Sequence, residues 1–111
     1  MKCVFINSAK QVLERETCEN FEDMQTLLGG YFEIAAWLPN GDTLYVNSEA
    51  LIQADVDYNA FIFQGNKYFG HGLIISHDSE GNIQTHQTGL RSISKIVSFV
   101  DMENIYLTDL F

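Results

Sequence analysis

Short segments separated by turn signals are the feature that most constrains how this chain can fold. Gly29-Gly30, the Pro39–Asp42 quartet and the Gln64–Lys67 quartet combine residue types that favour tight turns. Between them lie runs rich in β-branched and aromatic residues, which are typical of strands of about 4–8 residues. We therefore predict a single α+β domain over residues 1–111. Its sheet should be mostly antiparallel, with about five to seven short strands.

Two segments have helical patterning instead. Asn20 is a good N-cap, Asp23 stands at the third helical position, and Gly29 can adopt the left-handed conformation that ends a helix. Apolar residues at helical spacing follow the cap and recur near the C-terminus: Phe21, Met24, Leu27 and Leu28, then Leu90, Ile93, Ile96, Val97 and Val100. We therefore expect helices at about 20–29 and 90–101.

The strand expected at 31–38 offers a candidate interface. Strict alternation sorts its residues into two faces: Phe32, Ile34 and Ala36 on one, and Tyr31, Glu33, Ala35 and Trp37 on the other. A glutamate among aromatic residues indicates that the second face is not the deepest core. Exposed aromatic patches often mark interfaces. Tyr31, Glu33 and Trp37 are therefore candidate interface residues, and a homodimer through this sheet face is one hypothesis.

The composition indicates a folded domain in a reducing compartment. Apolar residues make up 46% of the chain, including eight Phe and five Tyr, which is enough for a core. No run approaches the ~18 apolar residues of a membrane span, and the apolar run ending at Ile6 is short for a signal peptide. Cys3 and Cys18 fit free thiols, with a disulfide between them left open. We expect a cytoplasmic protein.

The negative charge is concentrated in one central segment. The chain has a formal net charge of −9, and no Lys or Arg occurs between Glu16 and Asn66. That segment holds nine acidic residues: Glu16, Glu19, Glu22, Asp23, Glu33, Asp42, Glu49, Asp55 and Asp57. Such a surface repels nucleic acid and anionic membranes, so we expect neither as a partner. It fits a basic protein partner, with Asp55 and Asp57 as further interface candidates, or simply maintains solubility.

Three histidines and an aspartate are the weak candidates for a metal site: His71, His77, His86 and Asp78. A hairpin of residues 73–77 and 83–87 would bring His77 towards His86. Zinc needs three or four ligands in fixed geometry, and neither the HxH nor the HExxH spacing is present. The Gly-rich stretch 65–72 leads into a strand rather than a helix, so tight turns are favoured over a phosphate-binding loop. We expect no cofactor.

The order of these motifs resembles a family of small proteins of unknown function that is common in phage, plasmid and bacterial genomes. The resemblance rests on the helix, Gly-Gly stop and aromatic strand of Met24–Ile34, the Pro-Asn-Gly-Asp hairpin, and Tyr68–Ser76. It covers residues 20–80 and implies a fold and a genomic context, but no catalytic residues. We predict a non-enzymatic protein-interaction module of mobile-element origin. The alternative is a small hydrolase or ligand-binding enzyme that uses residues 71–86.

Overall fold

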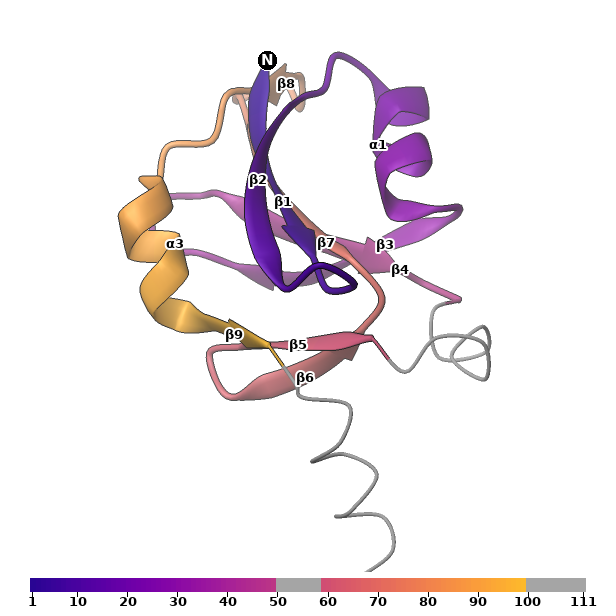
Figure 1. The fold of residues 1–111 in the computed structure, drawn as a ribbon. Helices are drawn as coiled ribbons and strands as arrows, with labels where there is room; N and C mark the ends of the chain where they lie inside the picture. The colour runs from indigo at the N-terminus through magenta and orange to yellow at the C-terminus, as the bar shows by residue number, and fades with distance from the viewer. Residues whose placement is uncertain (50–58, 100–111) are drawn as a thin grey trace, which may run out of the picture.

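The α+β prediction is confirmed by a computed structural model, which describes residues 1–49 and 59–99 (Figure 1). Two helices and nine strands occur in this part of the chain, and all strand pairs are antiparallel. Sheet A has the order β2-β1-β7-β4-β3, with β8 paired to β7, and sheet B has the order β6-β5-β9. The described part thus has nine strands in two sheets, where the sequence predicted one sheet of five to seven strands.

The elements of sheet A and its helix come mostly from the first half of the chain. They are β1 (Lys2–Asn7), β2 (Val12–Thr17), α1 (Phe21–Leu28), β3 (Phe32–Trp37), β4 (Thr43–Asn47), β7 (Gly72–His77) and β8 (Ile83–Gln84). The elements of sheet B and its helix are β5 (Ala60–Phe63), β6 (Asn66–Phe69), α3 (Leu90–Ile96) and β9 (Val97–Phe99).

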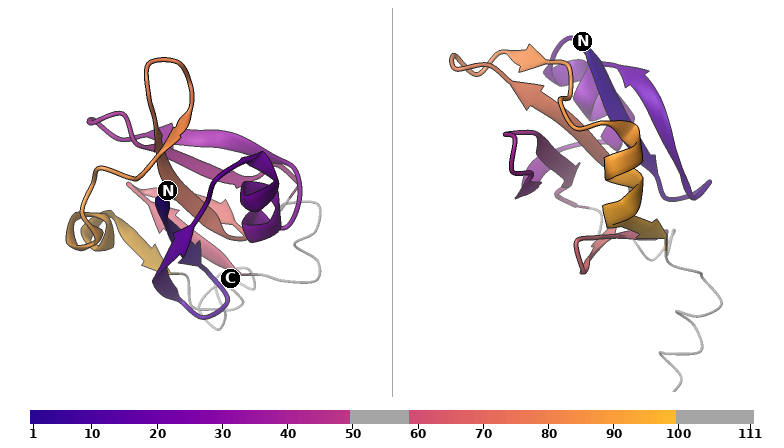
Figure 2. Two further views of the ribbon diagram at one scale, coloured as in Figure 1. Left: turned by 90° about the horizontal axis from the view of Figure 1, so that it is seen from above. Right: turned by 90° about the vertical axis from the view of Figure 1, so that its left-hand side faces the viewer.

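Sheet A is covered on both faces. On one face, Met24 and Leu28 of α1 pack with Cys3, Leu73 and Ile75. The residues that alternate with these face the other way: Val4, Ile6, Leu44, Val46 and Ile74 pack with Phe61 and Phe63 of sheet B and Ile93 of α3. Figure 2 shows α1 and α3 on opposite sides of the sheet. Within residues 1–49 and 59–99, no helix is long and apolar enough to cross a membrane.

Local capping defines α1 as the sequence predicts. The Asn20 side chain accepts a hydrogen bond from the Asp23 backbone N–H at 2.9 Å, and the Asp23 carboxylate accepts one from the Glu19 N–H at 2.9 Å. Gly29 ends the helix with φ of 85°. Asn47 then donates from Nδ2 to the Leu28 carbonyl at 3.0 Å, which ties the end of α1 to β4.

The second helix is shorter than expected. It ends at Ile96, and the chain continues as β9. Val97 pairs with Phe63 and Phe99 with Phe61, so the backbone of this segment forms a sheet ladder instead of helical bonds. The expectation of a helix to residue 101 was wrong because these β-branched and aromatic residues complete sheet B. Residues 100 and 101 lie outside the described part.

A β-bulge in β3 changes which side chains share a face. Ile34 pairs with Tyr45 and Trp37 with Thr43, while Ala36 pairs with Leu44, so Ala35 is the extra residue. Residues directly opposite each other point to the same side of a sheet. Trp37 therefore lies on the α1 side with Phe32 and Ile34, not with Glu33. The predicted alternation was wrong beyond Ile34 because the bulge inserts one residue.

Gly72 allows the two core layers to meet closely at the start of β7. A Cβ atom there would lie 2.8 Å from Phe61 Cζ, 3.1 Å from Ile6 Cδ1 and 3.2 Å from Leu44 Cδ1. Real side chains are not found as close as the first of these distances. A larger residue at this position therefore requires the Phe61 ring to move.

We predict that Gly72→Val lowers the free energy of unfolding by about 1–3 kcal/mol, because the added methyl groups overpack the core. Urea denaturation followed by circular dichroism would measure this change. Gly89→Ala is the matched control, since a Cβ there meets no atom within 4 Å. It should cost less than about 1 kcal/mol. Equal stability of the Gly72→Val variant and the parent would contradict the close approach.

Candidate functional site

Exposed apolar side chains gather on α1, β3 and the segment between them. Among the described residues, the exposed large hydrophobic side chains are Met1, Val12, Phe21, Tyr31, Ile34 and Trp37. Four of these lie between residues 21 and 37. Their exposed fractions are 63% for Phe21, 69% for Tyr31, 46% for Ile34 and 67% for Trp37. We call these four residues the β3 surface.

The length of α1 explains why part of this face stays open. A helix of 8 residues is roughly 12 Å long, whereas a strand of 6 residues is roughly 20 Å long. The helix therefore cannot cover the whole length of β3. Ile34 and Trp37 lie on the α1 side of β3 but remain exposed.

Ring contacts connect the β3 surface to the core. The Phe21 ring stacks on Phe32 at 6.0 Å between centroids, and Phe32 meets the edge of Tyr45 at 5.4 Å. The Tyr45 hydroxyl lies 2.7 Å from Nε2 of His77. Burial raises the pKa of Tyr45, so its hydroxyl stays protonated at neutral pH. The exposed Phe21 ring is thus in contact with a side chain that packs against buried Tyr45.

Strand β3 is also an edge of sheet A. The sheet order ends at β3, and no strand of the described part pairs with its outer side. An open edge presents backbone N–H and C=O groups that can pair with another extended chain. Exposed Ile34 and Trp37 would supply apolar contacts beside such a strand.

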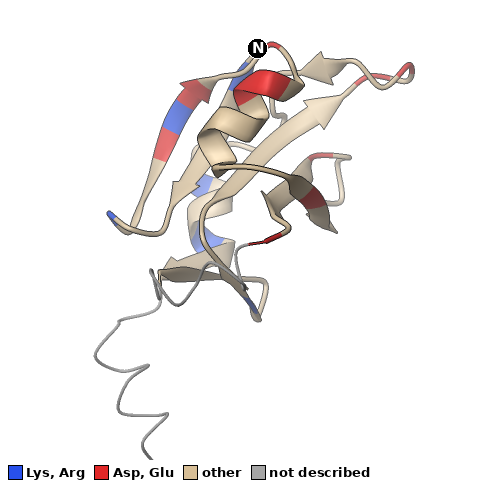
Figure 3. Ribbon diagram, turned by 90° about the vertical axis from the view of Figure 1, so that its right-hand side faces the viewer, with Lys and Arg blue, Asp and Glu red and all other residues tan. Residues whose placement is uncertain are grey.

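The charge around this edge is negative. Glu22, Glu33 and Glu49 are exposed, and the described residues from 16 to 49 contain no Lys or Arg. Figure 3 shows acidic positions on α1, on β3 and in the turn between β7 and β8, whereas β2 carries Arg15 between Glu14 and Glu16, and the charged residues of α3 and β6 are all basic. The β3 edge therefore favours a positively charged partner.

The structure places the predicted interface residues unevenly. Tyr31 and Trp37 belong to the β3 surface. Glu33 is exposed but pairs with Val46, so it points to the opposite face of the sheet from Trp37. Asp55 and Asp57 lie outside the described residues. Phe21 and Ile34 also belong to the β3 surface, although helical and strand periodicity assign them to buried faces.

The three histidines have separate hydrogen-bond partners. His71 Nδ1 accepts from the Ser8 backbone N–H at 3.1 Å, and His77 Nε2 bonds to Tyr45. His86 Nδ1 lies 2.7 Å from the Thr88 carbonyl oxygen and therefore donates to it. The predicted hairpin forms, with His77 paired to Ile83, but β8 ends at Gln84, before His86. Nδ1 of His77 is buried without a hydrogen-bond partner among the described residues.

Asp78 uses its carboxylate to shape its own turn. It accepts from the backbone N–H of Glu80 at 2.9 Å and of Asn82 at 2.8 Å, and from Nδ2 of Asn82 at 3.1 Å. The backbone bond from Asn82 is the largest cause of its lowered pKa. In the part of the chain that the structure describes, no three His, Cys, Asp or Glu side chains are grouped to hold a metal ion.

Asp42 has a structural role that the sequence did not reveal. Its side chain is fully buried, and its carboxylate accepts from the Gln87 N–H at 2.9 and 3.0 Å and from the Thr88 N–H at 2.7 Å. Asn40 reaches the same segment, donating to Thr88 Oγ1 at 2.7 Å. The hairpin of residues 39–42 thus holds the chain just before α3. In sequence, Asp42 has the pattern of an ordinary turn residue.

A known protein family matches almost the whole of this chain. The family model described as a domain of unknown function, DUF3846, matches residues 1–103. The chain belongs to the DUF3846 family. No curated protein and no solved structure matches it. The DUF3846 match is broader than the resemblance over residues 20–80, because it includes β1, β2, α3 and β9.

We predict that Asp42→Ala destabilises the DUF3846 domain by about 2–4 kcal/mol, because the N–H groups of Gln87 and Thr88 lose their buried acceptor. Chemical denaturation measures the change. Asp42→Asn keeps one acceptor oxygen and should lose less. Glu33→Ala removes an exposed acid from β3, the strand before the same turn, and should stay within about 0.5 kcal/mol of the parent. An Asp42→Ala variant as stable as Glu33→Ala would disprove this role.

Cys3 and Cys18 should be unreactive in the folded protein. Both are buried free thiols. Burial raises the pKa of Cys3 to about 12, and burial followed by the charge of Asp23 raises the pKa of Cys18. The thiolate is the reactive form, so we expect Ellman's reagent to label neither residue at pH near 7–8 until denaturant is added. Rapid labelling of the native protein would contradict this expectation.

Proposed function

We propose that this domain is a non-enzymatic protein-interaction module that binds an extended segment of a partner protein along β3. One observation carries the proposal: β3 is an open sheet edge that bears exposed Ile34 and Trp37, and Phe21 stacks on Phe32 of the same strand. Strand addition uses main-chain hydrogen bonds for affinity and alternate side chains for specificity. The β3 surface supplies apolar contacts of that kind.

The charge of the edge supports a partner whose apolar residues alternate with Lys or Arg. Glu22, Glu33 and Glu49 are exposed there, without a basic residue in the described segment from 16 to 49. Opposite charge across an interface speeds association and excludes wrong partners. A second copy of the chain would bring its own Glu33 to the same edge. A basic partner therefore fits this surface better than a homodimer does.

We further infer a mobile-element origin and a cytoplasmic location. The first inference rests on the resemblance carried by the helix, Gly-Gly stop and aromatic strand. The second is supported by Cys3 and Cys18, which are free thiols, as expected in a reducing compartment.

Trp37 offers a direct test, since it is the chain's single tryptophan and is 67% exposed. The probe is a peptide of about ten residues in which Lys and Val alternate. We expect its binding to shift Trp37 emission to shorter wavelength, because the partner strand covers the indole. A peptide of the same composition with Lys and Val in separate blocks should bind more weakly, since it cannot present one apolar face.

Ile34→Ser should weaken peptide binding roughly fivefold by removing apolar contact area. Val12→Ser is the matched control, because Val12 is 42% exposed on the opposite edge strand. Unchanged Trp37 emission, or equal loss in both variants, would disprove the proposal. Light scattering that gives a dimer mass, lost in Ile34→Ser, would instead identify a second copy as the occupant.

A further inference from the structure

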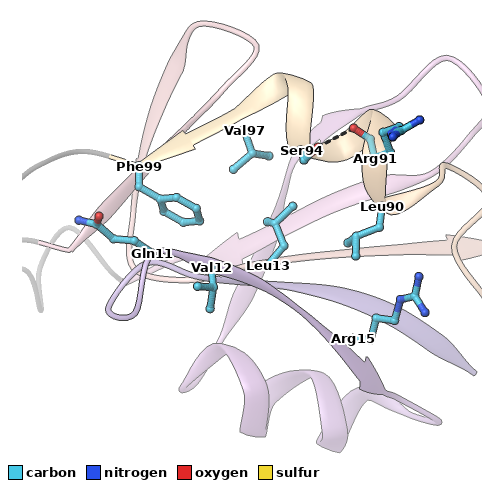
Figure 4. A pocket seen from close by; sticks show the side chains of 9 residues that line it. All are labelled: Gln11, Val12, Leu13, Arg15, Leu90, Arg91, Ser94, Val97 and Phe99. Atoms are coloured by element: carbon cyan, nitrogen blue, oxygen red, sulfur yellow. Dashed lines mark hydrogen bonds between the residues drawn. The ribbon is translucent and has the colours of Figure 1, made fainter.

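A cavity of about 640 Å³ lies at the other edge of sheet A, between β2 and the α3–β9 segment (Figure 4). Its lining includes Leu13 and Arg15 of β2, Leu90 and Arg91 of α3, and Val97 and Phe99 of β9. The cavity is a shallow groove that is widely open to solvent. Its volume falls within the range of about 300–1,000 Å³ that is typical of small-molecule sites.

Both arginines of this acidic chain line the cavity. The sequence contains Arg15 and Arg91 only, 76 positions apart, and the fold brings them to one site. Neither guanidinium has a hydrogen bond or ion pair with a residue of the described part. The hydrogen bond drawn at Arg91 in Figure 4 involves its backbone carbonyl, which accepts from Ser94 Oγ at 2.6 Å. Both side chains are exposed. Their donors are therefore available to a ligand.

Strand alternation separates Arg15 from its acidic neighbours. Arg15 pairs with Val4, whose side chain faces α3 and sheet B. Glu14 pairs with Phe5 and Glu16 with Cys3, which both face α1. The carboxylates on either side of Arg15 thus point to the other face of sheet A. The cavity side of β2 presents a positive charge and the apolar Leu13.

The charged and apolar parts of the cavity lie at different ends. In Figure 4, Arg15, Leu90 and Arg91 stand at one end, and Val97 and Phe99 stand at the other. The walls made by Leu13, Leu90, Val97 and Phe99 are partly buried in the core. A ligand here meets guanidinium groups at one end and apolar carbon along the rest.

We propose that this cavity binds an amphipathic organic anion, with a carboxylate or phosphate head at Arg15 and Arg91 and an apolar body along Leu13, Leu90, Val97 and Phe99. Arginine forms paired, charge-assisted hydrogen bonds with such heads. Screening over ~8–10 Å limits the effect of the formal charge of −9 at this site. The site is independent of the β3 surface, because β2 and β3 are opposite edges of sheet A.

The test is a titration of the isotope-labelled protein with octanoate, followed by amide chemical shifts. We expect saturable shifts in β2 and at the start of α3, with little change in β3. Octanol keeps the apolar body without the charge, and acetate keeps the head without the body. Each should bind at least roughly tenfold more weakly than octanoate. The same comparison is made for the phosphate head, with octyl phosphate as the complete ligand and inorganic phosphate as the head without the apolar body.

Arg15→Gln and Arg91→Gln should each weaken octanoate binding roughly fivefold or more, without changing octanol binding. Arg15→Lys keeps the charge and should lose less. Lys95→Gln is the matched control. It makes the same change in net charge and lies on α3 with Arg91, but Lys95 does not line the cavity. It should change affinity by less than about twofold.

Three results would overturn the proposal: octanol binding as tightly as octanoate, arginine variants that bind like the parent, or shifts confined to regions away from β2 and α3. Absence of saturation with both the carboxylate and the phosphate series would also overturn it. Circular dichroism of each variant confirms that the fold is retained. Failure here leaves the β3 proposal unaffected, because that test reads Trp37 at the opposite edge.

Discussion

Burial of β7 on both faces is the constraint on which the rest of this structure depends. On one face of the strand, Leu73 and Ile75 pack against α1. On the opposite face, Ile74 packs against sheet B and α3. A strand that is apolar on both faces needs a layer on each side and a paired strand along each edge. Strands β1 and β4 supply the pairing, and α1 and sheet B supply the layers. Gly72 sets how closely Phe61 of sheet B approaches.

The buried carboxylate of Asp42 connects the two halves of the chain. It holds the backbone of Gln87 and Thr88, and α3 begins at Leu90. This contact carries the C-terminal part of the chain across sheet A, so that Ile93 enters the core below β4 and α3 stands beside β2. The cavity with both arginines follows from that placement. A turn residue of the β3–β4 hairpin thus positions one wall of a site at the far edge of the sheet.

The two edges of sheet A differ in charge and in shape. At β3 the surface is apolar and acidic, and the open strand suits an extended basic partner. At β2 the α3–β9 segment adds a wall, so the edge forms a cavity with positive charge at one end. The charge thus differs between faces of the sheet as well as between its edges, since Glu14 and Glu16 lie on the opposite face of β2 from Arg15. The histidines do not contribute to either edge as a group, since the described partners of His71, His77 and His86 lie on different elements.

The sequence by itself determined the features that depend on local interactions. These are the Asn20 cap and Gly29 end of α1, the hairpin at Pro39–Asp42, the turn at Asp78–Asn82 and the α+β class. These features depend on residues within about five positions of one another, so propensity and spacing reveal them. Tertiary structure decided the bulge in β3, the change from helix to strand after Ile96, the burial of Asp42 and the meeting of Arg15 with Arg91. Each of these depends on partners far away in the chain. The physical reason is that edge position, register and burial follow from which strands pair, and a single segment does not contain that information.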